Sequence, residues 1–159
     1  MERIRSKIIL VDDNMTSLTM GRNMLKTFYE VYPAVSAAKL FEILENVLPD
    51  LILLDIEMPE IDGYEAMKRL KADARFADIP VIFLTSKTDA GSEMEGFDLG
   101  AADYIFKPFV APLLLTRIAN QLLIAQQKKE LLASREALQA YAAELEKKMC
   151  DKTKEVVCL

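Results

Sequence analysis

The sequence predicts an α/β protein built on a doubly wound parallel sheet of five strands, followed by an extended C-terminal helix. Short apolar segments alternate with segments of helical periodicity, an order that requires right-handed crossovers between parallel strands. The segment Leu51–Leu54 is apolar without alternation, which is typical of a strand buried on both faces. Four of the expected strands also end on a polar group, an observation that bears on function.

The first strand is expected over Lys7–Val11, a short β-branched run that ends on Asp12 and Asp13. Asn14 to Thr16 offer N-cap residues for a first helix, and apolar residues follow at helical spacing to about Tyr29.

A weaker second strand is expected over 30–35. Its Pro33 cannot donate to a strand ladder and belongs near an edge or a strand end. Ser36 caps a second helix, which carries an apolar stripe and is stopped by Pro49.

The third strand, the apolar run at 51–54, ends on Asp55. In α/β proteins the carboxyl end of such a strand is where ligands bind. Met58-Pro59 then blocks helix formation, and Asp62-Gly63 supplies turn chemistry before a third helix that fades near residue 73.

Two further strands are expected over 79–84 and 103–106, ending on Thr85 and Lys107 respectively. A fourth helix is expected between them, with Gly100 at its C-terminal left-handed position.

A single long helix is expected from Pro112 to about residue 156, because this stretch contains no further Gly or Pro and is rich in strong helix formers. Its first part should close the last face of the sheet with Leu114, Leu115, Ile118 and Leu122. The remainder should project from the domain, because no globular domain of this size needs so long a helix.

The second part of this helix carries a heptad repeat. Leucine or isoleucine recurs every seven residues, and the companion positions are mixed; the two sets are Ile124, Leu131, Leu138, Leu145 and Lys128, Arg135, Ala142, Met149, Val156. A solvated single helix with incidental leucines is the alternative, but it has nothing to bury this stripe against. We favour a parallel dimeric coiled coil, only moderately stable because of its Lys and Arg positions.

Length and composition limit the chain to one domain with an appendage. At 159 residues, 52% of them apolar, it can bury one full core. The net charge of −5 argues against nonspecific binding to nucleic acid or an anionic membrane, and suits cation binding. No run approaches the roughly 18 apolar residues of a membrane span, and the N-terminus is unlike a signal peptide. We therefore expect a cytoplasmic protein.

Two scarce residue types exclude classes of chemistry. The sequence contains no histidine, which excludes histidine-based acid–base catalysis and zinc sites that need imidazole. Cys150 and Cys158 are too few and too close together to staple a fold, so we expect reduced thiols. Any chemistry must use carboxylates, hydroxyls, lysine or a metal.

The polar strand ends supply such a set. In a parallel sheet Asp12, Asp13, Asp55, Thr85 and Lys107 converge on one rim. Clustered carboxylates repel one another, which raises a pKa or demands a cation, and Mg²⁺ or Mn²⁺ suits a site of oxygen ligands. With a lysine and a hydroxyl nearby, these are the parts of a phosphoryl-transfer site with an aspartate nucleophile. Each part alone has an ordinary structural explanation.

Four motifs in order resemble the receiver domain of two-component response regulators. They are VDD at 11–13, LLDIEMPEIDGYE at 53–65, IFLTS at 82–86 and GAADYIFKPF at 100–109. The resemblance covers about residues 5–125. It implies a flavodoxin-like fold with strand order 2-1-3-4-5.

The resemblance also implies roles for individual residues. Asp55 is the expected phosphoacceptor, and Asp12, Asp13 and Asp55 with the backbone carbonyl of Glu57 are the expected metal ligands. Thr85 and Tyr104 are the expected switch residues, with Thr85 and Lys107 contacting the phosphoryl group. The Lys107–Pro108 peptide bond is expected to be cis.

We therefore expect a receiver domain over 1–125 and a helical coiled-coil linker over 126–159. Asp55 would take a phosphoryl group from a sensor histidine kinase or phosphotransfer protein, and the long helix would relay the change in a homodimer. The chain would not itself be an enzyme. Two alternatives stay open: a haloacid-dehalogenase-like phosphatase, in which Glu57 stands where a second aspartate is needed, and a pseudo-receiver that dimerises without phosphorylation.

Two charged residues suggest control of the phosphoryl lifetime. Glu57 and Lys87 each lie two residues after a site residue, so opposite charges could pair across the entrance and hinder an attacking water. Two independent solvated charges are the equally weighted alternative.

The C-terminus has no cap or stop signal, as expected if the chain is cut inside a connector. Residues 152–156 resemble the linker ahead of HD-GYP phosphodiesterase domains, although diguanylate cyclases and kinases use similar helices. Any output activity would lie outside this sequence.

Overall fold

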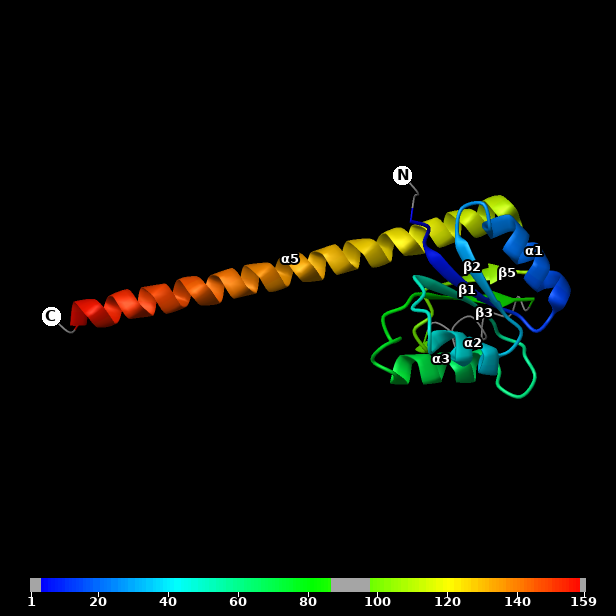
Figure 1. Cartoon of the computed structure of the whole chain (residues 1–159), viewed down its shortest axis with the longest axis horizontal. Coiled ribbons are helices and arrows are strands. Elements are labelled where there is room, and N and C mark those ends of the chain that lie inside the picture. The colour runs from blue at the N-terminus through cyan, green and yellow to red at the C-terminus, as the bar shows by residue number, and fades with distance from the viewer. Residues whose placement is uncertain (1–3, 87–97, 158–159) are drawn as a thin grey trace. The chain divides into compact units, whose positions relative to one another are not determined.

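The computed structural model describes residues 4–86 and 98–157 and contains a five-stranded parallel sheet (Figure 1). The strand order is β2-β1-β3-β4-β5, so the predicted fold class and strand order are confirmed. The strands are β1 (Lys7–Val11), β2 (Glu30–Ala34), β3 (Leu51–Asp55), β4 (Val81–Thr85) and β5 (Asp103–Phe106).

Helices cover both faces of this sheet. They are α1 (Met15–Leu25), α2 (Ala37–Leu44), α3 (Gly63–Ala72) and α5 (Ala111–Val157). The α2 and α3 helices pack on one face, and α1 with the first turns of α5 packs on the other (Figure 1).

The core has two layers because successive strand residues point to opposite faces. On β1, Ile9 and Val11 pack toward α2 and α3, whereas Ile8 and Leu10 pack toward α1 and α5. All four are at most 1% exposed. Burial on both faces explains why the strand sequences are apolar without alternation.

Pro33 explains why β2 lies at the edge of the sheet. The Asp12 N–H donates to the Ala34 carbonyl, and the Glu30 N–H donates to the Ser6 carbonyl, so even-numbered residues of β2 face β1. Pro33 therefore faces away from β1, where its missing N–H leaves no gap in the ladder.

Side-chain caps hold the starts of three helices. Asn14, Ser36 and Asp62 each accept a backbone N–H from the first turn that they precede. The helix ends were predicted less well: α1 ends at Leu25 and not near Tyr29, because residues 26–28 form turns. β4 begins at Val81, two residues later than predicted, since Pro80 cannot donate to the ladder.

The chain divides into two compact units, residues 1–122 and 123–159, and α5 contributes to both. Among the described residues, none of the helices is long and apolar enough to cross a membrane. Most of the predicted fourth helix lies outside the described residues, as does Lys87. Gly100 has a φ of 98°, the positive value expected of it.

Candidate functional site at the carboxyl ends of the strands

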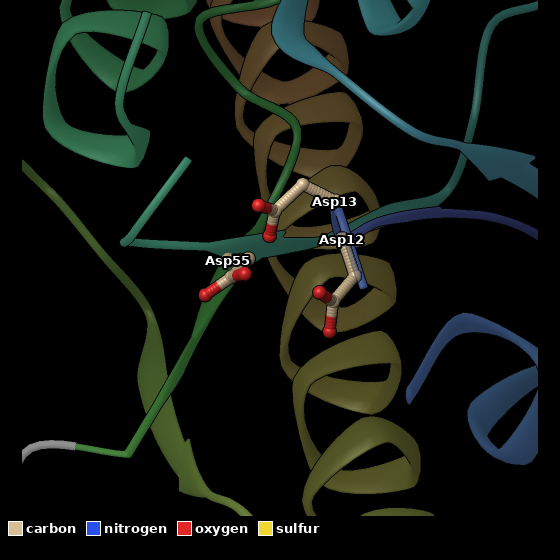
Figure 2. Close-up of side chains that lie close together, drawn as sticks. All are labelled: Asp12, Asp13 and Asp55. Carbon is tan, nitrogen blue, oxygen red and sulfur yellow. The ribbon is translucent and has the colours of Figure 1, made fainter. Parts of the chain in front are cut away.

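The polar residues predicted at the strand ends meet at one rim of the sheet. Asp12 follows β1, Asp55 and Thr85 end β3 and β4, and Lys107 follows β5. Asp12, Asp13 and Asp55 each offer a carboxylate oxygen, and these oxygens lie within 4.8 Å of one another. Figure 2 shows the three carboxylates gathered beside the ends of β1 and β3.

Backbone contacts fix Asp12 between the sheet and α1. Its N–H donates to the Ala34 carbonyl at 3.0 Å, which continues the β1–β2 ladder by one residue. Its Oδ1 accepts the Asn14 N–H at 3.0 Å, and Asn14 in turn caps α1. Asp12 therefore points its second oxygen, Oδ2, into the rim, where it is fully buried.

Lys107 bridges two of the acids. Its Nζ lies 2.7 Å from Asp12 Oδ2 and 3.2 Å from Asp55 Oδ2. Its backbone N–H donates to the Thr85 carbonyl at 2.8 Å, which ties the end of β5 to the end of β4. The Lys107–Pro108 peptide bond is cis. The ammonium group is thus held over the rim by the sheet itself.

The rim carries more negative than positive charge. Burial raises the pKa of Asp55 to about 7, and repulsion from Asp12 adds to the rise while Lys107 opposes it. For Lys107, burial lowers the pKa, but its close contact with Asp12 and the attraction of both acids outweigh burial, so the pKa is raised. Lys107 stays protonated at neutral pH and cannot balance three carboxylates.

One buried oxygen of Asp12 indicates that a divalent cation fits the site. Asp12 Oδ2 is buried and accepts no well-aligned hydrogen bond from the described residues, although the Lys107 ammonium lies 2.7 Å away. The ion pair is the stronger description, because attraction between opposite charges needs no strict alignment. This oxygen can still coordinate a cation, and two more carboxylates lie beside it, an arrangement that fits Mg²⁺ or Mn²⁺ well.

Glu57 lies against the same site through its backbone. Its N–H donates to Asp55 Oδ1 at 3.3 Å, which orients the carboxylate that Lys107 contacts on the other oxygen. The expected role of its carbonyl as a metal ligand stays a prediction.

Thr85 and Tyr104 are both buried, at 3% and 4% exposure. Thr85 ends β4 beside Asp55 in the sheet register, which pairs Asp55 with Leu84. The Tyr104 ring packs 5.6 Å from the ring of Phe83, which contacts Tyr64 at the start of α3 at 5.5 Å. An aromatic row therefore connects β5 to α3 under the rim.

Gly63 is a site residue that the sequence did not reveal, because Asp-Gly indicated only a turn. A Cβ atom at this position would lie 2.5 Å from the Asp55 carbonyl oxygen and 2.7 Å from Ile56 Cα. The Gly63 N–H also donates to the Ile56 carbonyl at 2.8 Å. The first turn of α3 thus packs directly on the backbone that carries Asp55, and only glycine permits this approach.

Comparisons with known proteins agree with this geometry. Residues 8–119 match the family described as "Response regulator receiver domain". A protein named "Probable cyclic di-GMP phosphodiesterase" of Vibrio cholerae is 39% identical over 132 residues, and the match covers 83% of this chain and 30% of that protein. The "DNA-binding dual master transcriptional regulator RpaA" of Synechocystis is 38% identical over 111 residues, covering 70% of this chain and 46% of the regulator. The chain thus spans less than half the length of these two relatives.

A solved structure shows the same fold. The chemotaxis protein CheY4 of Vibrio cholerae superposes with a TM-score of 0.71 at 26% sequence identity. The superposition covers 74% of this chain and 98% of CheY4.

Proposed function

Because the chain belongs to the response regulator receiver family, we propose that it is a phosphorylation-dependent signalling switch with Asp55 as the phosphoacceptor. The observation that carries this proposal is the position of Lys107, whose ammonium contacts Asp55 at 3.2 Å and Asp12 at 2.7 Å. A fixed cation beside one carboxylate of a crowded acidic cluster is suited to neutralise an incoming phosphoryl oxygen.

In the proposed transfer, an Asp55 carboxylate oxygen attacks the phosphorus of a phosphohistidine on a partner protein. The new P–O bond forms as the P–N bond breaks, and the departing imidazole takes up a proton from solvent. Only the ionised carboxylate is a nucleophile, so the raised pKa of Asp55 holds part of the metal-free protein inactive at neutral pH. Lys107 favours the ionised form.

Asp12, Asp13 and Asp55, with the Glu57 carbonyl, would hold the divalent cation. A bound Mg²⁺ would supply positive charge for the transferring phosphoryl oxygens. The side chains themselves orient the acceptor: Asp12 anchors Lys107, and the Glu57 N–H holds Asp55 Oδ1.

Once Asp55 carries a phosphoryl group, the negative charge that faces Lys107 lies on the phosphoryl oxygens. We infer that Lys107 and Thr85 then contact the phosphoryl oxygens and that Tyr104 changes its packing. Two observations support this assignment. Lys107 N–H already bonds the Thr85 carbonyl, and Tyr104 packs in the row that leads through Phe83 to α3. A local charge event would thereby reach β5 and α3, and the Asp103–Arg117 ion pair ties β5 to the first part of α5.

The partners follow from the same proposal. The phosphoryl donor would be a sensor histidine kinase or a phosphotransfer protein. A receiver domain over about residues 1–125 would signal through a helical linker over 126–159, which forms a parallel homodimer through its heptad stripe. The output activity would lie in another domain or protein, and cyclic di-GMP turnover is our first candidate because the 39% identical relative is named for it.

Glu57 and Lys87 remain our candidates for tuning the lifetime of the phosphoryl group. Decay of the phosphoprotein in Glu57→Ala and Lys87→Ala variants tests this idea. Decay rates equal to that of the parent would contradict it.

The experiment for the main proposal is phosphorylation by a small phosphodonor. We expect intact-mass spectrometry to find one added phosphoryl group on the parent with Mg²⁺, and none on Asp55→Ala. Asp50→Ala, which changes an acid at the opposite end of β3, is the matched control and should label like the parent. Rapid donor turnover without a stable adduct would favour a phosphatase, and no labelling would favour a pseudo-receiver.

A further inference from the structure

The second unit of the chain, taken by itself, is a helix with a leucine-rich heptad stripe that Lys128 and Arg135 interrupt. The stripe positions Ile124, Leu131, Leu138 and Leu145 are between 42% and 71% exposed, although large apolar side chains are usually buried. Together with their companions they extend over nearly four heptads, from 124 to 149, the length at which a heptad pattern indicates a coiled coil. A second copy of the chain would cover these apolar side chains, and no other protein would be needed.

The stripe has two parts of different character. The proximal seam consists of Ile124, Lys128, Leu131 and Arg135, and the distal seam consists of Leu138, Ala142, Leu145 and Met149. In a parallel dimer each seam residue faces its own copy. The distal seam would be wholly apolar, whereas the proximal seam would set lysine against lysine and arginine against arginine.

No acid at helical or seam-flanking spacing relieves the cations of the proximal seam, since Glu130 and Glu136 lie two and one residues from them. The positions three and four residues away from Lys128 and Arg135 are all uncharged, and so are the flanking positions that would line the proximal seam of a parallel dimer: Ala125, Gln127, Leu132 and Ser134. Among the described ion pairs of this unit, Glu144–Lys148 at 3.5 Å belongs to the distal part.

The distances make this repulsion significant. Lys128 and Arg135 are seven residues apart, about 10 Å along a helix, so a dimer would bring four positive charges within roughly one Debye length at 0.1 M salt. Long side chains can turn their charged ends outward, which reduces the repulsion but leaves the layers poorly filled.

We propose that two copies of the chain pair mainly along the distal seam, while Lys128 and Arg135 keep the proximal seam weakly paired. This inference rests on the homodimer proposed above. It adds that the proximal seam is the part of the dimer whose pairing can change. This part is the segment nearest in sequence to the receiver domain, so a modest bias from that domain is enough to close or open it.

The test is the dissociation constant of the full-length dimer, measured by sedimentation equilibrium. Lys128→Gln with Arg135→Gln removes the seam charges without adding apolar surface. Lys129→Gln with Lys147→Gln makes the same change of net charge outside the seam and is the matched control. We expect the seam variant to dimerise about tenfold more tightly at low salt, and the control to change less than about threefold.

Salt provides a second readout. Raising NaCl from about 0.05 M to about 0.5 M should tighten the parent dimer and leave the seam variant nearly unchanged, because screening weakens a repulsion that the variant lacks. If the parent dimerises but the seam variant and the control behave alike, this inference is overturned and the homodimer stands. If the parent stays monomeric at every concentration, the homodimer itself fails, and an unlike partner helix must cover the stripe.

Discussion

The receiver domain and the second part of α5 are both incomplete, but in opposite ways. The domain has a fully buried apolar core on both faces of its sheet and leaves charge unbalanced: Asp12 and Asp55 are at most 4% exposed and share one lysine. The helix satisfies its backbone hydrogen bonds and leaves apolar residues uncovered, with Leu131 at 71% and Leu138 at 68% exposure. Each deficiency indicates a different kind of missing component.

Excess buried negative charge is relieved by a cation, whereas uncovered leucine is relieved by another apolar surface. The two regions should therefore respond to different perturbations. Metal and pH should act on the domain, and protein concentration should act on the helix.

The largest expected difference concerns burial. Phe83 is fully buried between Tyr64 and Tyr104, so Phe83→Ala should lower the free energy of unfolding of the domain by about 3–5 kcal/mol. Leu138→Ala should change it by less than about 0.5 kcal/mol in dilute protein, because Leu138 loses no cover in the monomer. Denaturant unfolding followed by tyrosine fluorescence measures both. Equal losses of unfolding free energy in the two variants would show that Leu138 is covered as well as Phe83 is.

The next effect is the dependence of stability on pH. The pKa of Asp55 is raised to about 7 in the folded domain, above its unfolded value near 4, so the folded state binds the proton more tightly. The stability from this proton is fully present below pH 4 and is lost as the pH rises toward 7. We expect the metal-free domain to lose about 2 kcal/mol over this window, less than the full shift implies because solvent near the rim screens the charges.

Asp55→Asn is the matched variant for this measurement, since it keeps the shape and removes the titration. Its stability should stay nearly level between pH 4 and 7. A parent that becomes more stable over the same window without metal would contradict the charge imbalance. Saturating Mg²⁺ should remove the loss in the parent, because the cation favours the ionised carboxylate.

Much of the domain was predictable because its local patterns agree with its global fold. The run at 51–54 indicated a doubly buried strand, Pro33 indicated an edge, and the N-caps at Asn14 and Ser36 fixed two helix starts. Helix ends were less predictable, since Phe28 continues the helical spacing of α1 yet residues 26–28 form turns. Ends depend on what the last turn packs against, and sequence periodicity does not contain that information.

The site was predictable at the level of residue types and strand ends. The sequence could not reveal that Lys107 divides its contacts between Asp12 and Asp55, or that Gly63 sits on the Asp55 carbonyl. Both are properties of packing between elements distant in the chain.

A smaller effect is expected at the exposed acid of the cluster. Asp13 is solvent-exposed, so Asp13→Asn should leave the fold intact while it removes a charged oxygen from the candidate metal site. We expect Mg²⁺ affinity to fall about tenfold, or about 1.4 kcal/mol, with isothermal titration calorimetry as the measurement. Asp50→Asn at the other end of β3 is the control. Unchanged affinity in Asp13→Asn would remove this residue from the site.

The smallest effect concerns the ion pair that fastens the first part of α5 to the sheet. Arg117 Nη1 lies 2.6 Å from Asp103 Oδ1, the same oxygen that accepts the Tyr104 N–H at 2.8 Å. The pair is partly exposed, and Arg117 Nε is buried without a hydrogen-bond acceptor among the described residues, which reduces its net value. Arg117→Ala should therefore cost only about 1 kcal/mol of domain stability.

A matched change in the second part of α5 completes the comparison. Lys148 pairs with Glu144 on the same helix at 3.5 Å, and both side chains are more than 60% exposed. Lys148→Ala should alter the unfolding of the domain by less than about 0.3 kcal/mol, because an exposed pair within one helix fastens it to nothing else. Unfolding in urea at micromolar protein concentration measures both variants. If Arg117→Ala were as silent as Lys148→Ala, the ion pair would add nothing to the apolar packing by Leu114 and Ile118 that holds α5 on the sheet.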